Sequence, residues 1–484
     1  MQFEAAKLAG HIEQLKSLRN LVCMNFNRIF AFSLFLVGSM ASAQEWSVTQ
    51  IGPGPNKETY DLVIGDVRND QTDRVYVSTK NGAVYEWSYD QSSTSWSYKI
   101  IQSNLKGLVT IDYGDARHDG KNRLYFTEFV DQGRLFEAEW DGSDWKTTLI
   151  ETGYHSLSLV VGDGRNDGKD YLYIGSTNVG TWELDWKDTG WAKTQLHFQA
   201  SEGVGVVGAS KNDGVNRLLF TSDKVREYTW SGSKFNMDSP SPKIEWPDAI
   251  DIGQGRNDGI NRIYANCFNG RGRLEYTWNG TSWTETMINP VVHRGDLYLA
   301  AVKADGKARV YTTTSEYFKG KAGNFLEFEW NSANISFDST ILLDATSGAT
   351  AMIYAGYGRG DDTMRLYASN YVKGTIYELT NTNPYVRNAG SVGKPINLYE
   401  SFSVTKNPVT SLVGFELVLP EPADFTIELA NFMGETLRSK TYQNTQSIQD
   451  QIQLNIGANT HPSGLYYLRV RVNGQAFARR VMVL

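Results

Sequence analysis

A short motif rich in glycine and aspartate recurs seven times along the chain, and it constrains the fold more than any other feature. Its copies read GDVRNDQTDRVYV from Gly65, GDARHDGKNRLYF from Gly114, GDGRNDGKDYLYI from Gly162, GASKNDGVNRLLF from Gly208, GQGRNDGINRIYA from Gly253, AVKADGKARVYT from Ala301 and GYGRGDDTMRLYA from Gly356. Successive copies lie about 45 to 55 residues apart, which is the period of a propeller blade. The chain is therefore expected to consist mainly of seven equivalent units.

Each repeat carries the signals of four short strands. An apolar strand such as Leu157–Val161 precedes the motif, and a strand such as Arg123–Thr127 follows it. A glycine-bearing turn leads to a third strand, such as Arg273–Trp278, and a fourth strand carries a Trp and an aliphatic residue, as in Trp145–Ile150. Four antiparallel strands in each of seven repeats predict an all-β fold with a seven-bladed β-propeller over residues 44–382.

The two ends of the repeat region complement each other. The seventh repeat stops after Thr375–Leu379 without a fourth strand, whereas Trp46–Ile51 matches the pattern of the other fourth strands. We expect this N-terminal segment to pair into the seventh blade and close the ring. Closure would remove an open sheet edge, where unpaired backbone groups invite aggregation.

The N-terminal region has the pattern of an export signal. Arg28 precedes an apolar run at 29–37, and Ala41–Ala43 offers small residues for cleavage. The sequence therefore predicts an upstream segment at 1–23 and a signal peptide at about 24–43. Because the apolar run is too short to span a bilayer, no transmembrane anchor is expected after processing.

The repeat pattern ends after Leu379. A polar linker with Gly and Pro is expected at 383–400, followed by a separate β domain at 401–484. Alternating apolar and polar residues, as in Phe425–Leu429 and Ser463–Arg469, predict a small antiparallel β-sandwich in this domain.

Several motifs occur together in this C-terminal module. They are Asn407-Pro408 near its start, Phe425–Leu429, Gly434–Leu437, Ser463–Arg469 and a basic, then apolar, ending at Arg479–Leu484. As a set they resemble the C-terminal sorting domain of the type IX secretion system of Bacteroidetes-like bacteria. The resemblance implies export by the type IX machinery of a Gram-negative bacterium, followed by attachment to the outer-membrane surface or release. It gives no information about the ligand of the propeller.

The repeated motif is similar in composition to a calcium loop. In the third repeat, Asp163, Asp167 and Asp170 could supply the oxygen ligands that Ca²⁺ prefers. Most repeats, however, have cations at the third and ninth positions of the loop, counted from the first Asp. These are Arg68, Arg117, Arg165, Lys211, Arg256 and Arg359, and then Arg74, Arg123, Arg217, Arg262, Arg309 and Arg365.

Guanidinium groups at these positions can bridge the loop carboxylates with paired hydrogen bonds. The sequence therefore favours internal ion pairs and no cofactor. Calcium stays as an alternative for the third repeat, where Tyr171 occupies the ninth position.

A second pattern repeats in the third strand of each unit. Its members are Glu86, Glu137, Glu183, Glu227, Glu275, Glu327 and Glu378. They can pair across strands with the Arg that begins the second strand, while the repeated Trp and Tyr are expected to pack between blades. An Arg, a Glu and a Trp in each blade are also the groups with which fucose-binding propeller lectins hold a sugar, so repeated sugar sites are an alternative by analogy.

Features that differ between repeats are better candidates for a unique site. The loops before the first strands and those between the second and third strands of a propeller share one face, around the channel. Basic residues of the fifth to seventh repeats fall there, namely Arg271, His293, Arg294, Lys319, Lys321 and Lys373. Tyr154 and His155 precede the first strand of the third repeat, and Glu58 and Glu202 occupy matching positions. Such a rim would suit an acidic polysaccharide.

Composition narrows the function without identifying it. The net charge of −7 gives no reason to expect nucleic acid, and the sequence has no zinc, P-loop or GxSxG motif. Removal of Cys23 with the leader would leave Cys267 without an internal disulfide. The sequence favours a secreted or cell-surface binding module, without enzymatic activity, whose ligand is a carbohydrate. A polysaccharide lyase that uses His155 or His293 is the first alternative, and a protein–protein interaction scaffold is the second.

Overall fold

The computed structural model describes residues 45–483, apart from several short segments. The segments left out are 54–57, 81, 199–202, 241–246, 268–270, 292–294, 315–322, 345–351, 372–373, 388–401, 406–408, 410–411, 432–435, 454–463 and 473–474. All the elements described are β-strands. Within this part of the chain, no helix is long and apolar enough to cross a membrane.

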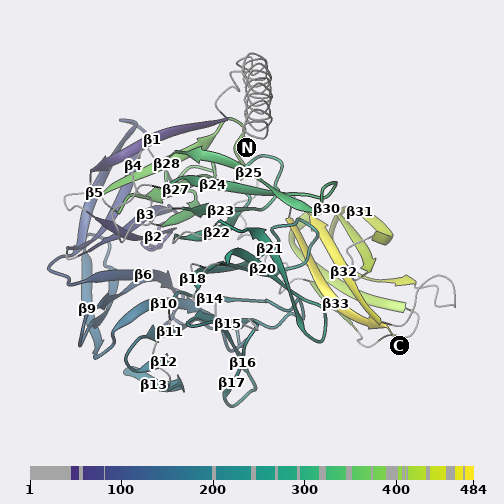
Figure 1. Ribbon diagram of the computed structural model, residues 1–484, viewed down its shortest axis with the longest axis horizontal. Helices are drawn as coiled ribbons and strands as arrows, with labels where there is room; N and C mark the ends of the chain where they lie inside the picture. Colours follow the sequence, from purple (N-terminus) through teal and green to yellow (C-terminus); the bar gives the residue numbers. More distant parts are fainter. Residues whose placement is uncertain are drawn as a thin grey trace, which may run out of the picture. The chain divides into compact units, whose positions relative to one another are not determined.

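Seven four-stranded antiparallel sheets form the blades of a propeller (Figure 1). The first four blades comprise β2 (Thr59–Gly65), β3 (Arg74–Thr79), β4 (Val84–Asp90), β5 (Ser95–Gln102), β6 (Leu108–Gly114), β7 (Arg123–Phe129), β8 (Arg134–Trp140), β9 (Trp145–Thr152), β10 (Ser156–Gly162), β11 (Tyr171–Ser176), β12 (Gly180–Lys187), β13 (Gly190–His197), β14 (Gly205–Gly208), β15 (Arg217–Thr221), β16 (Val225–Trp230) and β17 (Phe235–Asp238). The last three comprise β18 (Pro247–Gly253), β19 (Arg262–Cys267), β20 (Gly272–Trp278), β21 (Trp283–Asn289), β22 (Leu297–Ala300), β23 (Arg309–Thr313), β24 (Phe325–Asn331), β25 (Ser336–Leu343), β26 (Ile353–Gly356), β27 (Arg365–Ser369), β28 (Thr375–Asn381) and β1 (Trp46–Pro53). The predicted seven-bladed propeller is confirmed.

Burial follows the position of each strand in its blade. The first strands lie nearest the centre of the ring in Figure 1, and the fourth strands lie at its periphery. All six residues of the second strand β11 are buried, because both of its faces are covered by neighbouring blades. The outer strand β25 instead keeps Ile341 58% exposed. The core is therefore divided among the interfaces between blades.

The predicted closure of the ring is confirmed. The seventh sheet has the order β1-β28-β27-β26, so the N-terminal strand supplies its outermost member. Ile51 of β1 is 6% exposed and belongs to an apolar cluster with Trp87 of blade one and with Tyr367 and Ile376 of blade seven. This arrangement covers the edge of β28 that the seventh repeat alone would leave open.

The motif loops also connect each blade to the next. The side chain of Asn69 in blade one accepts a hydrogen bond from the backbone N–H of Asn122 in blade two (2.7 Å) and donates one to its carbonyl (3.0 Å). Asn69 has a φ of 60°, a left-handed conformation that Asn tolerates better than most residues. The same pairing recurs between later blades, through Asn166 with Asn216, Asn212 with Asn261, and Asn257 with Ala308.

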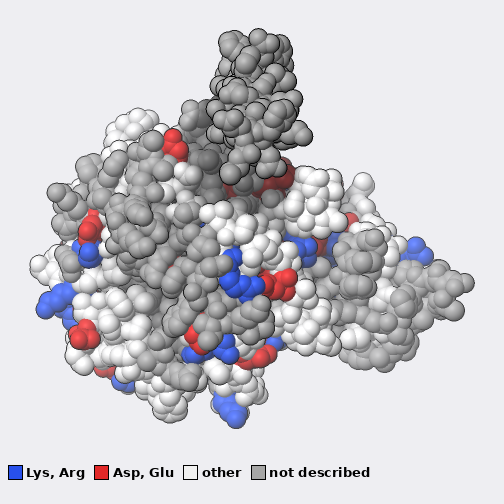
Figure 2. All heavy atoms as spheres, in the orientation of Figure 1, with Lys and Arg blue, Asp and Glu red and all other residues white. Residues whose placement is uncertain are grey.

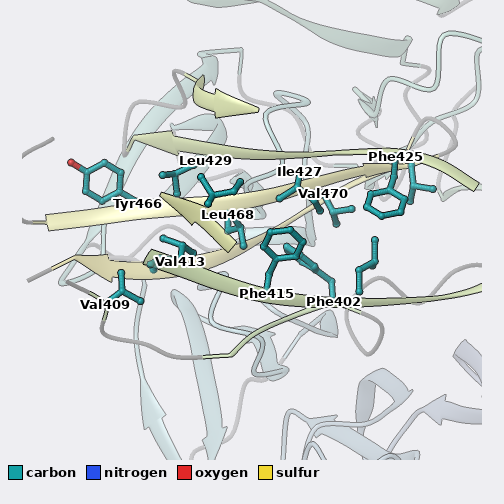
Figure 3. Packing of buried hydrophobic residues seen from close by; sticks show 14 of the residues in the cluster. Phe402, Val409, Val413, Phe415, Phe425, Ile427, Leu429, Tyr466, Leu468 and Val470 are labelled. Atoms are coloured by element: carbon teal, nitrogen blue, oxygen red, sulfur yellow. The ribbon is translucent and has the colours of Figure 1, made fainter. Parts of the chain in front are cut away.

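The C-terminal module is a five-stranded antiparallel sheet wrapped around its own core. Its strands are β29 (Phe402–Val404), β30 (Leu412–Asn431), β31 (Thr436–Gln453), β32 (Gly464–Val472) and β33 (Gln475–Val483), in the order β29-β30-β32-β33 with β31 paired to β30. The first part of β30 pairs with β29 and the second part with β32, on either side of an irregularity between Val418 and Ala423. Figure 3 shows Phe402, Phe415 and Phe425 converging with aliphatic side chains in this core. The predicted small antiparallel β-sandwich is confirmed.

The chain that follows β28 stays on the propeller for several residues. The backbone N–H of Tyr385 donates to the carbonyl of Val302 (2.7 Å), and that of Arg387 donates to Asp362 (2.7 Å). Residues 383–387, which the sequence assigns to the linker, thus bond to loops of blades six and seven. Residues 388–400 lie outside the described part of the chain.

Candidate functional site in the central channel

The candidate calcium residues of blade three have separate partners. Asp163 accepts the backbone N–H groups of Asp167 (3.1 Å) and Gly168 (3.0 Å), so it caps its own loop. Asp167 accepts the hydroxyl of Tyr171 (2.7 Å), and Asp170 accepts the backbone N–H of Asp115 in blade two (3.2 Å). Among the described residues, no three His, Cys, Asp or Glu side chains are grouped so that they could hold a metal ion.

In the other blades, the loop carboxylate bonds to arginine as the sequence predicts. In blade one, Arg74 donates two parallel hydrogen bonds to Asp70, at 2.8 and 2.7 Å. The hydroxyl of Tyr171 replaces this guanidinium in blade three. The predicted pairing of the third-strand glutamate is present as a longer ion pair, since Glu86 lies 3.9 Å from Arg74, and Glu86 bonds more closely to the loop residue Arg68 (2.8 Å).

The arginines of these ion pairs also contact Trp rings of the next blade. The guanidinium of Arg68 lies 3.6 Å from the ring centroid of Trp140 in the next blade, and Arg117 and Arg256 lie 4.1 Å from Trp186 and Trp330. The aromatic face on which a lectin would stack a sugar is therefore occupied by a cation of the protein itself. In these three blades the Arg, Glu and Trp residues therefore form an inter-blade contact.

The predicted basic rim is represented by one residue in the described part of the chain. Arg271 forms an ion pair with Glu285 of the same blade, so its charge is compensated locally. His293, Arg294, Lys319, Lys321 and Lys373 lie outside the described residues, as does Glu202. On the face that Figure 2 displays, described Lys and Arg side chains lie next to Asp and Glu. The rim residues therefore remain a prediction.

Tyr154 and His155, the ligand-binding residues predicted before the first strand of blade three, lie in different environments. Tyr154 is 4% exposed and packs against Trp182, so it belongs to the core. The ring of His155 stacks on Phe129 with centroids 4.0 Å apart, and its Nδ1 lies 3.9 Å from Asp131. His155 is thus beside a carboxylate, whereas a lyase site would need a cation there to neutralise a uronate.

The structure brings together a set of residues that the sequence prediction did not include. A cavity of about 550 Å³ runs along the central channel. It is lined by residues in or next to the first strands of all seven blades, among them the carboxylic acids Asp61, Asp112, Asp251 and Asp296, and by Asp163 of the blade-three loop. Each is half-buried, with part of its surface reachable from the channel. The channel is therefore a candidate binding site.

The four carboxyls cap the exposed edges of the first strands. Asp61 accepts the backbone N–H of Ile111 in the next blade (3.0 Å) and that of Leu62 in its own strand (2.8 Å). The corresponding bonds from the next blade reach Asp112, Asp251 and Asp296 at 2.8 Å each, from Val161, Leu299 and Ile353. An innermost strand has one edge without a neighbouring strand, so these side chains satisfy N–H groups that would otherwise face the channel.

Burial changes the acidity of these groups. Desolvation by the surrounding protein raises the pKa of all four aspartates to about 7, although the backbone hydrogen bonds act in the opposite direction. The carboxyls also interact electrostatically, since the charge of Asp61 contributes to the raised pKa of Asp112 and Asp296. At neutral pH, therefore, these four carboxyls can gain or lose protons when a ligand enters or leaves the channel.

Aromatic rings and one hydroxyl complete the lining. Tyr298 and Tyr354 of adjacent blades pack with ring centroids 4.5 Å apart, and burial raises the pKa of both phenols. Thr110 is 4% exposed, and its Oγ1 has no hydrogen-bond partner among the described residues. On the opposite side, Val160 and Val206 give the cavity an apolar wall.

A sequence signal for these acids did exist. Asp61, Asp112, Asp251 and Asp296 interrupt or immediately precede apolar first strands, in TYDLVIG, LVTIDYG, PDAIDIG and GDLYLA. An aspartate inside a buried strand is rare and generally has a specific partner. Its significance was hidden because the acids occupy two different register positions and occur in only four of the seven repeats.

Comparison with known proteins adds no family to this description. No family model matches the chain, and no curated protein matches it. Among solved structures, the crystal structure of BBS1N in complex with ARL6DN, soaked with lead, has a TM-score of 0.47 and 9% identity, over 71% of this chain and 99% of that chain. The same complex soaked with mercury has a TM-score of 0.47 and 10% identity, over 70% and 97%. This likeness carries no argument about what the present chain binds.

Proposed function

We propose that the protein is a binding module that holds a carbohydrate in its central channel and does not turn it over. The observation that carries this proposal is the mixed lining of the cavity. Asp61, Asp112 and Thr110 offer hydrogen-bonding groups, while Val160 and Val206 offer apolar contact. A sugar presents hydroxyls at its ring edge and C–H groups on its faces, so it can use both kinds of surface. The volume of about 550 Å³ is also typical of small-molecule sites.

The charge of the channel favours neutral over acidic sugars. The described residues that line the cavity include five Asp and no Lys, Arg or His. A uronate would place its carboxylate among like charges, at a cost that rises as the site loses water. Support for an acidic polysaccharide therefore comes only from the rim residues predicted by the sequence. The same described lining residues include no cation that could neutralise the uronate carboxylate of a lyase substrate.

A blocking substitution tests whether binding takes place in the channel. Met352 lines the cavity and is half-buried, so Met352→Trp should fill part of it and weaken the best oligosaccharide from a glycan array by at least about tenfold. Calorimetric titration measures the change. Met237→Trp is the matched control, because Met237 is 49% exposed on the outer strand β17. Unchanged affinity in a folded Met352→Trp protein would remove the channel as the binding site.

Export and surface location form the second part of the proposal. They rest on the signal pattern at residues 24–43 and on the resemblance of residues 401–484 to a type IX sorting domain. The β-sandwich of the C-terminal module is compatible with this role. N-terminal sequencing and cell fractionation test the proposal, with a start near Gln44 and recovery at the surface or in the medium as the expected result. Recovery of the uncleaved chain inside the cell would contradict it.

A further inference from the structure

The lining of the channel combines acids with aromatic rings. Besides the four aspartates, the cavity is bordered by Tyr60, Tyr113, Tyr298 and Tyr354. These tyrosines are close enough to the acids that the negative charge of one or more aspartates contributes to the raised pKa of each phenol. A positively charged group that entered here would meet carboxyl oxygens and the electron-rich faces of aromatic rings.

The acids stand at two levels along the channel. In each of the four blades that carry them, the last residue of the first strand pairs with the Arg that begins the second strand. Asp61 and Asp296 lie four residues before this last residue, whereas Asp112 and Asp251 lie two residues before it. Two residues of a strand span roughly 6 to 7 Å. A ligand that extends along the channel can therefore contact an acid at each level.

A buried hydroxyl provides an independent sign that the cavity is built for a polar ligand. Thr110 lies at the same register level as Asp61 and Asp296, four residues before Gly114. Its Oγ1 is buried and has no hydrogen-bond partner in the described part of the chain. Leaving such a group unsatisfied costs about 1 to 3 kcal/mol, so a bound hydroxyl or amino group at this level would recover stability.

We infer that the channel selects an amino sugar, a carbohydrate whose protonated primary amine is held by Asp61 and Asp296 while its hydroxyls reach Thr110 and the acids of the other level, Asp112 and Asp251. This inference rests on the proposed binding of a carbohydrate in the channel, and it specifies the charge of that carbohydrate. The ammonium group stabilises the ionised form of the neighbouring carboxyls, and each ionised carboxyl strengthens the hydrogen bond that it accepts. An N-acetylated sugar carries no such charge.

Three matched ligands test the inference with the full chain. They are hexasaccharides of glucosamine, of N-acetylglucosamine and of glucose, all with the same β-1,4 linkage. In calorimetric titrations at about pH 7 and low salt, glucosamine hexasaccharide is expected to bind at least about tenfold more tightly than the other two. The double variant Asp61→Asn/Asp296→Asn is expected to reduce this preference to less than about threefold.

The asparagine variant is suited to this test because it resembles the protonated acid. Each Asn keeps one oxygen that can accept a backbone N–H, although it gives up the second such bond, and the raised pKa of both acids favours an uncharged group at these sites. The control is Asp144→Asn/Asp238→Asn, which removes the same charge from side chains that are 68% and 65% exposed. Its preference for glucosamine should equal that of the wild type.

The possible outcomes separate the inference from the proposed function. Equal binding of all three hexasaccharides, with sensitivity to Met352→Trp, would overturn the amino-sugar inference and leave carbohydrate binding in the channel intact. Binding of none of a broad set of sugars would overturn both. A preference for glucosamine that survives in the folded Asp61→Asn/Asp296→Asn protein would place the selectivity outside the channel and overturn the inference.

Discussion

Deletion of residues 45–51 is expected to lower the midpoint of thermal unfolding by at least roughly 10 °C. The deletion removes most of β1, so the outer edge of β28 loses its hydrogen-bonding partner. It also removes Ile51 from the apolar cluster that joins blades one and seven. Because closure involves the first and last parts of the ring, its loss should weaken the cooperativity of all seven blades. Differential scanning calorimetry measures both the midpoint and the width of the transition.

A point substitution in β1 shows whether the burial of Ile51 contributes to stability without shortening the chain. Ile51→Asp places a carboxylate at a site that is 6% exposed, and we expect it to cost about 3 kcal/mol or more in the free energy of unfolding. Ile341→Asp is the matched control, because Ile341 is 58% exposed on the outer strand β25. A shortened or Ile51→Asp protein that melts like the wild type would show that the ring closes without β1.

Raising the pH from about 5 to about 8 is expected to destabilise the protein because the four channel aspartates lose their protons. The pKa of the four channel aspartates is about 7 in the folded state, against 3.8 for an ordinary aspartate. Between these values the folded chain binds more protons than the unfolded chain, so the free energy of unfolding falls as the pH rises. The contribution is fully present below about pH 4 and is lost as the pH rises through about 7. Since one pKa unit corresponds to about 1.4 kcal/mol, the four groups together should account for at least about 2 kcal/mol.

Comparison with an uncharged channel isolates this effect. The variant in which Asp61, Asp112, Asp251 and Asp296 are all replaced by Asn should lose most of the slope between pH 5 and 8 in urea unfolding experiments. Other carboxyls whose pKa is raised by burial, such as that of Glu183, titrate in both proteins and cancel in the difference. Wild-type stability that rises with pH in parallel with the variant would contradict the assignment.

The repeats were sufficient to predict the architecture because each blade is specified locally. Strand, motif loop and strand follow one another within about 50 residues, and the loop's own side chains fix the turn, as Asp163 does by capping Asp167 and Gly168. The ion pair between Arg74 and Asp70 joins residues four positions apart, so its spacing is visible in the sequence. The incomplete seventh repeat and the matching N-terminal strand likewise predicted closure, since open sheet edges are unfavourable.

The partners of the repeated aromatic residues were decided by contacts between blades. Trp140 lies 72 positions after Arg68 in the chain (140 − 68), yet the two stack because neighbouring blades pack face to face. From the sequence, an Arg, a Glu and a Trp in each blade fit a sugar site as well as a structural contact. Only the packing shows that the cation of one blade covers the ring of the next.

By itself, the sequence determined the seven blades, their closing strand and the internal ion pairs of the loops, because these depend on periodicity and on short-range spacing. Tertiary structure alone decided that Asp61, Asp112, Asp251 and Asp296 share one cavity. These acids lie in or next to the first strands of four blades, spread over more than two hundred residues, and they meet only because ring closure brings every first strand to the axis. Their raised pKa has the same origin, since it depends on the low-dielectric wall that the complete ring supplies.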